Sequence, residues 1–144
     1  MRTDSRLSRM LHVLLHMARQ DSLFTSDTVA QMLNTNPVVV RRTLGQLKKA
    51  GYVDAKKGPG GGWFIACDLQ STTLLDIYNA VGAPHLFAMG HNEDRPDCAV
   101  EKVINQALEQ TFREAEQLIL HKLGHITLAD LLQDFDKLCR VLPN

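Results

Sequence analysis

The sequence predicts a mainly α-helical protein in which a helix-turn-helix and a small β-hairpin precede one long helix. Three observations predict this fold. Apolar residues recur at spacings of three and four over residues 5–50, and turn-forming residues divide this stretch into three helices. A glycine-rich run at residues 58–62 separates two short strand-like runs. The three-four spacing then returns and continues for about six helical turns over residues 100–122.

The first two predicted helices are amphipathic. The first covers residues 5–19, where the apolar stripe consists of Leu7, Met10, Leu11, Leu14, Leu15 and Ala18. The second covers residues 27–33, and Thr25 or Ser26 offers a side-chain oxygen that can cap its first N–H groups.

The third helix follows after a tight turn made of Asn34, Thr35 and Asn36. Pro37 suits a first helical position, because the N–H that proline lacks has no helical partner there. Gly51 marks the end of a helix that covers residues 37–50. Two helices joined in this way form a helix-turn-helix.

A β-hairpin is predicted directly after this motif. Residues 52–55 and 63–66 are strand-like, and the run Gly58-Pro59-Gly60-Gly61-Gly62 lies between them. A hairpin that follows a helix-turn-helix forms the wing of a winged helix. The glycine run lacks the following Gly-Lys-Ser/Thr of a P-loop, so it does not predict a nucleotide site.

The rest of the chain begins with a fourth helix over residues 74–81, for which Ser71 or Thr72 is the predicted cap and Gly82 the end. Residues 82–97 lose all apolar periodicity, and a loop of this length suggests a function.

We therefore predict three parts. Residues 1–82 form a winged helix-turn-helix DNA-binding domain, residues 83–98 a sensor-type loop, and residues 99–144 a dimerisation helix with a C-terminal tail. The stripe of the long helix consists of Val100, Val103, Ile104, Ala107, Leu108, Thr111, Phe112, Ala115, Leu118 and Ile119. A first half this small cannot bury such a helix alone, so dimerisation is favoured over folding back on its own domain. Thr127 is predicted to cap a last short helix over residues 128–132, and the tail from there to Asn144 can form another turn or two.

Composition limits the class of protein. The chain has 144 residues, 44% hydrophobic and 22% charged, with no apolar run long enough to cross a membrane and no export signal. We expect a cytoplasmic protein. Its three cysteines, Cys67, Cys98 and Cys139, form neither a disulfide framework nor a Cys-x-x-Cys metal motif.

The net charge of zero hides two oppositely charged halves. Residues 1–64 hold ten Lys and Arg against four Asp and Glu, and residues 65–144 hold six against twelve. A basic N-terminal half suits a polyanion, and nucleic acid is the partner that this predicts.

The third helix carries the candidate recognition surface. On a helical wheel Val40, Leu44 and Leu47 face the first two helices. The opposite face carries Val38, Arg42, Gly45, Gln46 and Lys49, with Arg41 at its flank. Arg reads guanine edges, Gln reads adenine, and Lys binds phosphate, so this face suits a major groove of double-stranded DNA. A plain solvated face is the alternative.

The wing supplies further candidate contacts. Lys56 and Lys57 lie at its base, and backbone N–H groups of Gly60 and Gly61 at its tip can face phosphate. Arg2, Arg6 and Arg9 on the first helix can reach flanking phosphates.

Three segments carry a resemblance to a known family. The helix Pro37-Val-Val-Val-Arg-Arg-Thr-Leu-Gly-Gln-Leu-Lys-Lys-Ala-Gly51, the wing Lys57-Gly-Pro-Gly-Gly-Gly-Trp63 and the segment Thr73-Leu-Leu-Asp76-Ile-Tyr-Asn-Ala-Val81 resemble the Rrf2 family of bacterial transcription regulators. That family includes an iron–sulfur cluster regulator, a nitric-oxide-sensitive repressor and a cysteine-metabolism repressor. The resemblance implies a homodimer crossed through the long helix, with two winged helices on successive major grooves of an imperfect palindrome. A repressor is the expected role.

One feature departs from the family. Cluster-bearing members place three cysteines in the loop and at the start of the long helix, whereas this chain has only Cys98 there. We expect Cys67 on the second wing strand and Cys139 in the tail. No 2Fe-2S cluster, and no other cofactor, is therefore expected.

The signal that the loop reads stays open at this point. Cys98 at a helix N-terminus suits a redox switch, since the helix dipole lowers a thiol pKa. His85, His91 and Cys98, with Glu93, Asp94 or Asp97, offer metal-ligand types at loose spacing. A small effector between the fourth and the long helix is a third possibility.

Two other classes of function stay in view. A winged helix can bind another protein instead of DNA, and a shallow salt dependence of DNA binding would indicate that class. No Ser-His-Asp set, paired catalytic carboxylates or nucleotide cradle is recognisable, so an enzyme is not expected.

Overall fold

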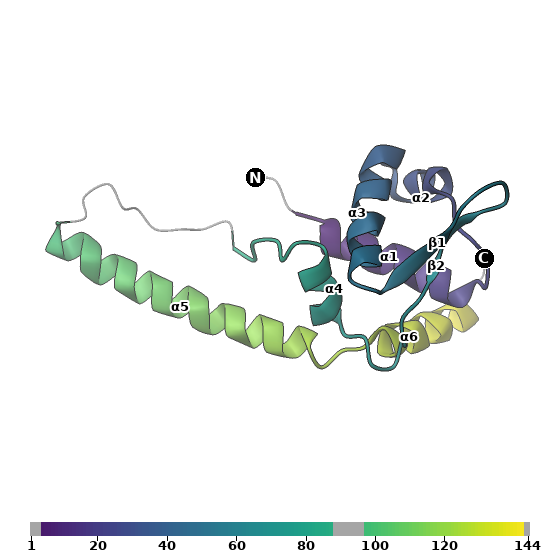
Figure 1. The fold of residues 1–144 in the computed structure, drawn as a ribbon. Coiled ribbons are helices and arrows are strands. Elements are labelled where there is room, and N and C mark those ends of the chain that lie inside the picture. Colours follow the sequence, from purple (N-terminus) through teal and green to yellow (C-terminus); the bar gives the residue numbers. More distant parts are fainter. Residues whose placement is uncertain (1–3, 88–96, 143–144) are drawn as a thin grey trace.

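The computed structural model describes residues 4–87 and 97–142, and Figure 1 shows how their elements are arranged. The helices are α1 (Arg6–Arg19), α2 (Ser26–Leu33), α3 (Pro37–Lys49), α4 (Leu74–Ala80), α5 (Ala99–Leu123) and α6 (Leu128–Val141). The strands β1 (Val53–Lys56) and β2 (Gly62–Ile65) pair antiparallel, with Val53 opposite Ile65 and Lys56 opposite Gly62. This is the mainly helical fold with a two-stranded wing that the sequence predicts.

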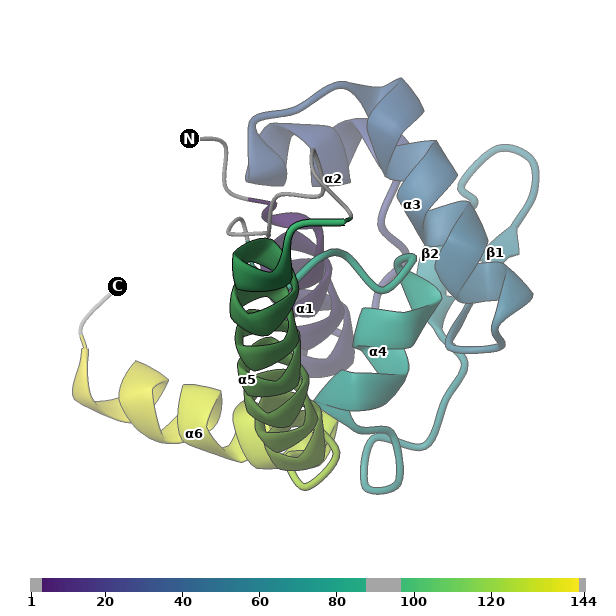
Figure 2. The ribbon, with the colours of Figure 1, turned by 90° about the vertical axis from the view of Figure 1, so that its left-hand side faces the viewer.

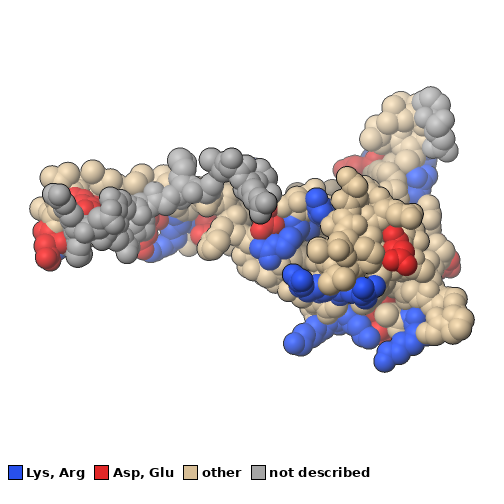
Figure 3. All heavy atoms as spheres, turned by 90° about the horizontal axis from the view of Figure 1, so that it is seen from above, with Lys and Arg blue, Asp and Glu red and all other residues tan. Residues whose placement is uncertain are grey.

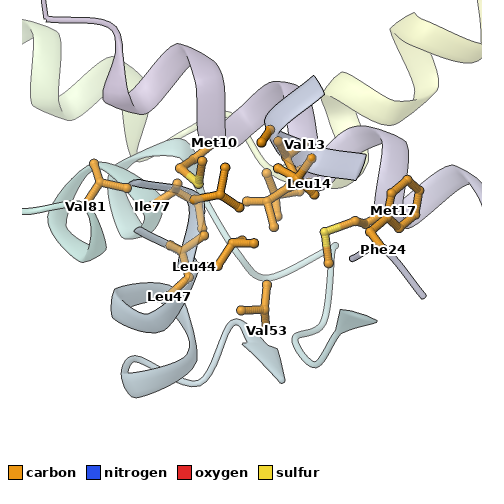
Figure 4. Close-up of a cluster of buried hydrophobic side chains, with 14 of the residues drawn as sticks. Met10, Val13, Leu14, Met17, Phe24, Leu44, Leu47, Val53, Ile77 and Val81 are labelled. Atoms are coloured by element: carbon orange, nitrogen blue, oxygen red, sulfur yellow. The ribbon is translucent and has the colours of Figure 1, made fainter. Parts of the chain in front are cut away.

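The first four helices and the hairpin enclose one hydrophobic core, shown in Figure 4. The buried side chains are Met10, Val13, Leu14 and Met17 of α1, Val29 and Ala30 of α2, Val40, Leu44 and Leu47 of α3, Val53 of β1, Leu74 and Ile77 of α4, and Leu128 of α6. The stripe predicted for α1 is partly wrong: Met10 and Leu14 are buried, but Val13 and Met17, which it left out, are buried as well, and its other members are half-buried.

Side-chain caps hold the helix-turn-helix. Thr25 Oγ1 accepts a hydrogen bond of 3.1 Å from the backbone N–H of Thr28 at the start of α2. Asn36 Oδ1 accepts one of 2.8 Å from the N–H of Val38 at the start of α3. Asn34 ends α2 in the left-handed conformation, with φ of 52°. The turn between the two helices is thus fixed at both ends.

The wing is fastened to the segment before α2. Phe24 and Trp63 exchange two backbone hydrogen bonds of 3.0 and 2.8 Å, and the Trp63 indole N–H donates to Ser26 Oγ at 3.0 Å. An added Cβ at Gly62 would lie 2.9 Å from the backbone oxygen of Phe24, so this close pairing requires glycine.

Capping boxes start α4 and α6, and they lie side by side. Thr73 caps α4 with Asp76, and Thr127 caps α6 with Asp130. The strand-like segments before the two helices also pair, because the N–H of Leu74 donates to Ile126 and that of Leu128 donates to Thr72, each at 2.9 Å. Thr127 is the cap that the sequence predicts.

The predicted cap of α4 is wrong by one or two residues. Thr73 caps the helix, whereas Ser71 and Thr72 belong to the turn before it. The hydroxyl of Thr72 donates to the backbone oxygen of Asp68 at 2.7 Å and is buried there. Three consecutive hydroxyl side chains offer the same capping chemistry, so only the path of the chain selects one of them.

The last helix is longer than predicted. It runs to Val141 instead of ending at Leu132, because apolar residues continue at helical spacing through Phe135 and Leu138 and no helix breaker precedes Pro143. It packs on α1, and Arg19 lies 3.3 Å from Asp136 and 4.9 Å from the centre of the Phe135 ring.

Two cysteines lie in elements other than those predicted. Cys67 follows β2, which ends at Ile65, instead of lying on it. Cys139 lies on α6, not in an irregular tail, and its sulfur accepts a hydrogen bond of 2.8 Å from the guanidinium of Arg19. The predicted ends of the second wing strand and of the last helix are wrong, and for this reason both cysteines were assigned to the wrong elements.

Helix α5 projects from the rest of the molecule as a separate rod, as Figures 1 and 2 both show. None of its residues is buried, and only its C-terminal end touches α4. Its large apolar side chains Val100, Val103, Ile104 and Leu118 are exposed. Despite these side chains, no helix in the described ranges is both long and apolar enough to cross a membrane.

Candidate nucleic-acid interface

The candidate interface is built on α3, and the core fixes which side of this helix faces out. Val40, Leu44 and Leu47 are at most 1% exposed and hold α3 against α1 and α2. Because these positions are three and four residues apart, their burial turns the opposite side of the helix to solvent. The orientation predicted from the helical wheel is confirmed.

The outward side of α3 presents polar side chains without partners in the chain. Arg41, Arg42, Gln46 and Lys49 are exposed, and within residues 4–87 and 97–142 their side chains form no hydrogen bond or ion pair. The neighbouring Lys48 differs, because its Nζ lies 3.7 Å from Asp54 Oδ1 on β1. The candidate recognition side chains are thus free to bind an external partner.

Gly45 lies in the middle of this outward side. An added Cβ there would meet no atom within 4 Å, so nothing inside the chain requires glycine. Glycine in a helix interior costs about 1 kcal/mol relative to alanine. The helix therefore loses stability at a position where a partner can approach its backbone closely.

The N-terminal end of α3 is apolar. Pro37 occupies its first position, and Val38 and Val39 follow, with 53% and 41% of their surfaces exposed. The amide of Asn36, which would otherwise be the polar group nearest this end, is used as the helix cap.

The wing presents two more cations and a glycine tip. Lys56 and Lys57 are exposed, as is Gly60, whose φ is 75°. Gly61 is half-buried, and its N–H donates to the backbone oxygen of Gly58 at 3.0 Å. The tight turn therefore uses one of the two N–H groups predicted to face phosphate.

The cations of helix α1 have different roles. The Arg6 guanidinium contacts Asp4 at 2.8 Å and the backbone oxygen of Val81 at 3.2 Å, so it fastens the end of α4. This hydrogen-bonded contact also holds the pKa of Asp4 below its ordinary value. Arg9 is exposed and stays a candidate phosphate contact, while Arg2 lies outside the described residues.

Lys and Arg side chains gather on one part of the surface. Figure 3 shows them grouped on one face of the winged-helix part of the molecule, whereas the projecting rod carries acidic and basic side chains together. The basic excess of the N-terminal half of the sequence is therefore gathered on this face.

The loop that follows α4 is held at its beginning. The Tyr78 hydroxyl donates to the backbone oxygen of Pro84 at 2.6 Å, and burial raises the pKa of this phenol, which keeps it protonated. Phe87 stacks on Phe112 of α5, with ring centres 5.6 Å apart.

The candidate sensor residues are only partly described. Cys98 is the half-buried N-cap residue of α5, and its side chain makes no capping hydrogen bond. His85 and Asp97 are exposed, whereas the other predicted ligands, His91, Glu93 and Asp94, lie outside the described residues. Among residues 4–87 and 97–142, no three His, Cys, Asp or Glu side chains are grouped as metal ligands.

Two positioning contacts were missed by the sequence analysis. The Trp63–Ser26 hydrogen bond fixes the wing against α2, and the Lys48–Asp54 pair joins the end of α3 to β1. In the sequence, each contact shows only as two polar residues that could pair. The fold of the hairpin is what brings the two members of each pair within contact distance.

Comparisons with known proteins agree with this arrangement. A model of the Rrf2 family, described as an iron-dependent transcriptional regulator, matches residues 3–134. YwnA of Bacillus subtilis (strain 168), which is named as an HTH-type transcriptional regulator, is 35% identical over 131 residues, or 90% of this chain and 96% of YwnA.

Solved structures give the same result. One from Lactobacillus plantarum, named as a transcriptional regulator, is 27% identical with a TM-score of 0.75, and the match covers 92% of this chain and 90% of the other. IscR of T. potens is similar in fold, with a TM-score of 0.66, 18% identity, and coverage of 100% of this chain and 93% of the other.

Proposed function

Since the chain belongs to the Rrf2 family of transcriptional regulators, we propose that it represses transcription as a homodimer bound to an imperfect palindrome in double-stranded DNA. The observation that carries this proposal is the outward side of α3. Arg41, Arg42, Gln46 and Lys49 are exposed and have no partner among the described residues, and the other side of the helix is fixed by the core.

The recognition side chains have separate tasks. Arg42 and Gln46 lie one turn apart on α3, and their head groups suit guanine and adenine edges. Lys49, Lys56 and Lys57 suit phosphates, which set the register of the protein on the duplex. Arg41 flanks the same face.

The dimer forms through α5. Its 25 residues extend for about 37 Å, and the described residues leave much of its apolar stripe uncovered, including Val100, Val103, Ile104 and Leu118. Exposed apolar surface of this length is covered when a second copy packs along it in a two-fold arrangement. Such a dimer presents two copies of α3, and half-sites one helical turn of DNA apart are the expected operator geometry.

Cys98 is the proposed sensor of this dimer. It lies half-buried at the N-terminus of α5, directly before the helix that is proposed to form the dimer. A peroxide would oxidise the thiol to a sulfenic acid and be reduced to water or an alcohol. We propose that this change beside the dimer helix weakens DNA binding.

The family description names iron, and the cysteines of this chain do not fit a 2Fe-2S cluster. Such clusters take several thiolates from nearby backbone, whereas Cys67, Cys98 and Cys139 lie on three separate segments. We propose that the chain works without a cluster. Iron and sulfide content and visible absorbance after anaerobic purification test this, and a stoichiometric cluster would contradict it.

The central experiment is selection of bound sequences from a random DNA pool with reduced protein. A palindrome is the expected result. Weak binding without a motif, abolished by modest salt, would favour a protein partner instead. Peroxide should weaken binding to the selected operator, and Cys98→Ser should not respond. An unchanged response in Cys98→Ser would remove the redox proposal and leave the DNA-binding proposal intact.

Variants separate base reading from phosphate binding. Arg42→Ala should cost about 1–3 kcal/mol and relax specificity at one base position, whereas Lys57→Ala should weaken all sequences alike and lower the salt slope by about one. Equal losses on every sequence for both variants would contradict base reading by α3.

Gly45→Ala provides a test that misfolding cannot imitate. Alanine should stabilise α3 by about 1 kcal/mol, because its Cβ meets no atom of the chain. The same methyl should weaken operator binding if DNA approaches the helix closely. Greater thermal stability with unchanged affinity for the operator would show that DNA does not contact the helix closely at Gly45.

A further inference from the structure

We propose that Val38 reads the methyl group of a thymine, so that each half-site of the operator carries a T·A pair at a fixed position. The inference rests on the proposed function. It adds to that function a specificity determinant that forms no hydrogen bond.

The first argument is the position of Val38. It is the second residue of α3 and lies on the same side of the helix as Arg42, one turn further along. The recognition helix of a helix-turn-helix contacts base edges through its N-terminal residues. Val38 therefore lies at the end of the helix that enters the groove.

The second argument is chemical. The isopropyl group of Val38 is 53% exposed, and a DNA groove that covers it must offer it an apolar surface. In the major groove of unmodified DNA, the thymine C5-methyl is the apolar group on the base edges. A base-edge donor or acceptor pressed against the isopropyl group would lose water without gaining a hydrogen bond, which is unfavourable.

The third argument is that the polar group nearest this end is already used. Asn36 Oδ1 accepts the N–H of Val38 at 2.8 Å, so the amide oxygen and the N–H both belong to the helix cap. An Asn that reads adenine needs both ends of its amide for the base. The cap therefore leaves the isopropyl group, not the amide, as the reading element.

The side chain is also rigid. Valine in a helix has one strongly preferred rotamer, so the isopropyl group is held in place before DNA binds. Val39 differs although it is 41% exposed, because it lies about 100° further round α3 and lines a cavity between α1 and α3 with Arg9 and Thr43. Val39 is therefore a matched control.

The helix also fixes where the thymine must lie. Val38 and Arg42 are four residues apart, which is about 6 Å along the helix axis. This equals about two steps along one DNA strand. The thymine is expected about two base pairs from the pair that Arg42 reads.

The experiment replaces each thymine of the selected operator with deoxyuridine, which keeps every hydrogen-bonding group and removes the methyl. For one thymine in each half-site, affinity should fall about fourfold, the value of one buried methylene-sized group, and about fifteenfold when both half-sites are changed. In Val38→Ala the same replacement should have almost no effect, whereas in Val39→Ala the full effect should persist.

A second measurement places a C5-methyl group on cytosine instead of thymine. The T·A pair is changed to C·G and then to 5-methylcytosine·G, and the added methyl should restore about fourfold in the wild-type protein but not in Val38→Ala. If no thymine is sensitive, or if Val38→Ala keeps the sensitivity, the inference fails. That failure differs from failure of the proposed function, in which no operator is selected.

Discussion

The winged-helix body, formed by α1 to α4 and the wing, buries its large apolar side chains, whereas helix α5 leaves many of its own exposed. In the body, Leu44 and Ile77 are completely buried among side chains of the same chain. On α5, Val103 is 67% and Leu118 is 56% exposed, although these residues follow the same helical spacing. The same sequence pattern thus predicts a helix in both regions. In the body, side chains of the same chain cover the apolar side of each helix, whereas the described residues leave much of the apolar side of α5 exposed.

The difference separates two kinds of stability. The body buries its core on folding of a single chain, so its stability does not depend on protein concentration. In the proposed dimer, the exposed side of helix α5 is packed by the partner copy, so its contribution to stability should grow with protein concentration. Substitutions in the two regions should differ in kind as well as in size.

The largest expected effect compares the same substitution in the two regions. Leu44→Ala leaves a cavity in the core and should lower the free energy of unfolding by about 2–5 kcal/mol at every protein concentration. Leu118→Ala leaves no cavity in the body. Urea titrations at several concentrations should show a concentration-dependent loss for Leu118→Ala alone. Equal, concentration-independent losses would mean that α5 is covered by its own chain.

A charge in the apolar stripe of α5 tests the dimer directly. Ile104→Glu should raise the dimer dissociation constant at least about a hundredfold, because two carboxylates would be buried without partners. Gln106→Glu places the same charge on the opposite side of the helix and is the matched control. Sedimentation should show a folded monomer for Ile104→Glu and a dimer for the control. A dimer in both variants would place the interface elsewhere.

A smaller effect is expected at the start of α4, within the body. Thr73→Ala should cost about 1 kcal/mol of stability, since Thr73 Oγ1 accepts the N–H of Asp76 at 3.1 Å. Ser71→Ala should change stability by only a few tenths, because its hydroxyl lies in the preceding turn. Thermal unfolding of both variants measures the difference, and a larger loss in Ser71→Ala would overturn the assignment of the cap.

The smallest effect is a pH dependence of the contact between α1 and α6. Burial, with His12 and Arg19 nearby, lowers the pKa of His16, whose ring packs on Phe135. The unfolded chain then binds more protons, so this contribution to stability is complete above about pH 6.5 and is lost as pH falls through the lower folded pKa.

Two variants isolate this term. His16→Phe keeps a ring against Phe135, and its stability should fall less than that of the wild type below about pH 6.5. His85→Phe, at an exposed position, should show the same fall as the wild type. Urea titrations at pH 5.5 and pH 7.5 measure the change. An identical decline in wild type and His16→Phe would show that His16 does not contribute.

Membership in the Rrf2 family confirms the predicted fold class and the prediction that the chain is not an enzyme, because its relatives are transcriptional regulators. The site residues on α3 lie on the side predicted for them, although their DNA contacts stay predictions. Most errors concern ends of elements, namely the cap of α4, the length of α6, and the places of Cys67 and Cys139, and one concerns the buried side of α1, where Val13 and Met17 were left out. Local patterns define the middle of an element better than its end, where several residues offer equivalent capping chemistry.

Local sequence patterns are enough to locate the helices, the wing and the outward side of α3. Periodicity decides which side of a helix is apolar, and proline, asparagine and glycine decide where its chain can turn. Gly45 and Val38 were identified in the same way, as residues that a solvated helix face does not require.

Which of these surfaces remain exposed depends on how the elements pack together. The structure showed that Arg6 fastens α4, that Gly61 uses its N–H in the turn of the wing, and that Asn36 is occupied as a cap. It also showed that α6 packs on α1, whereas the described residues leave Val100, Val103, Ile104 and Leu118 of α5 exposed. Such partners are distant in sequence, and their distances depend on how all the elements pack together, which no local pattern encodes.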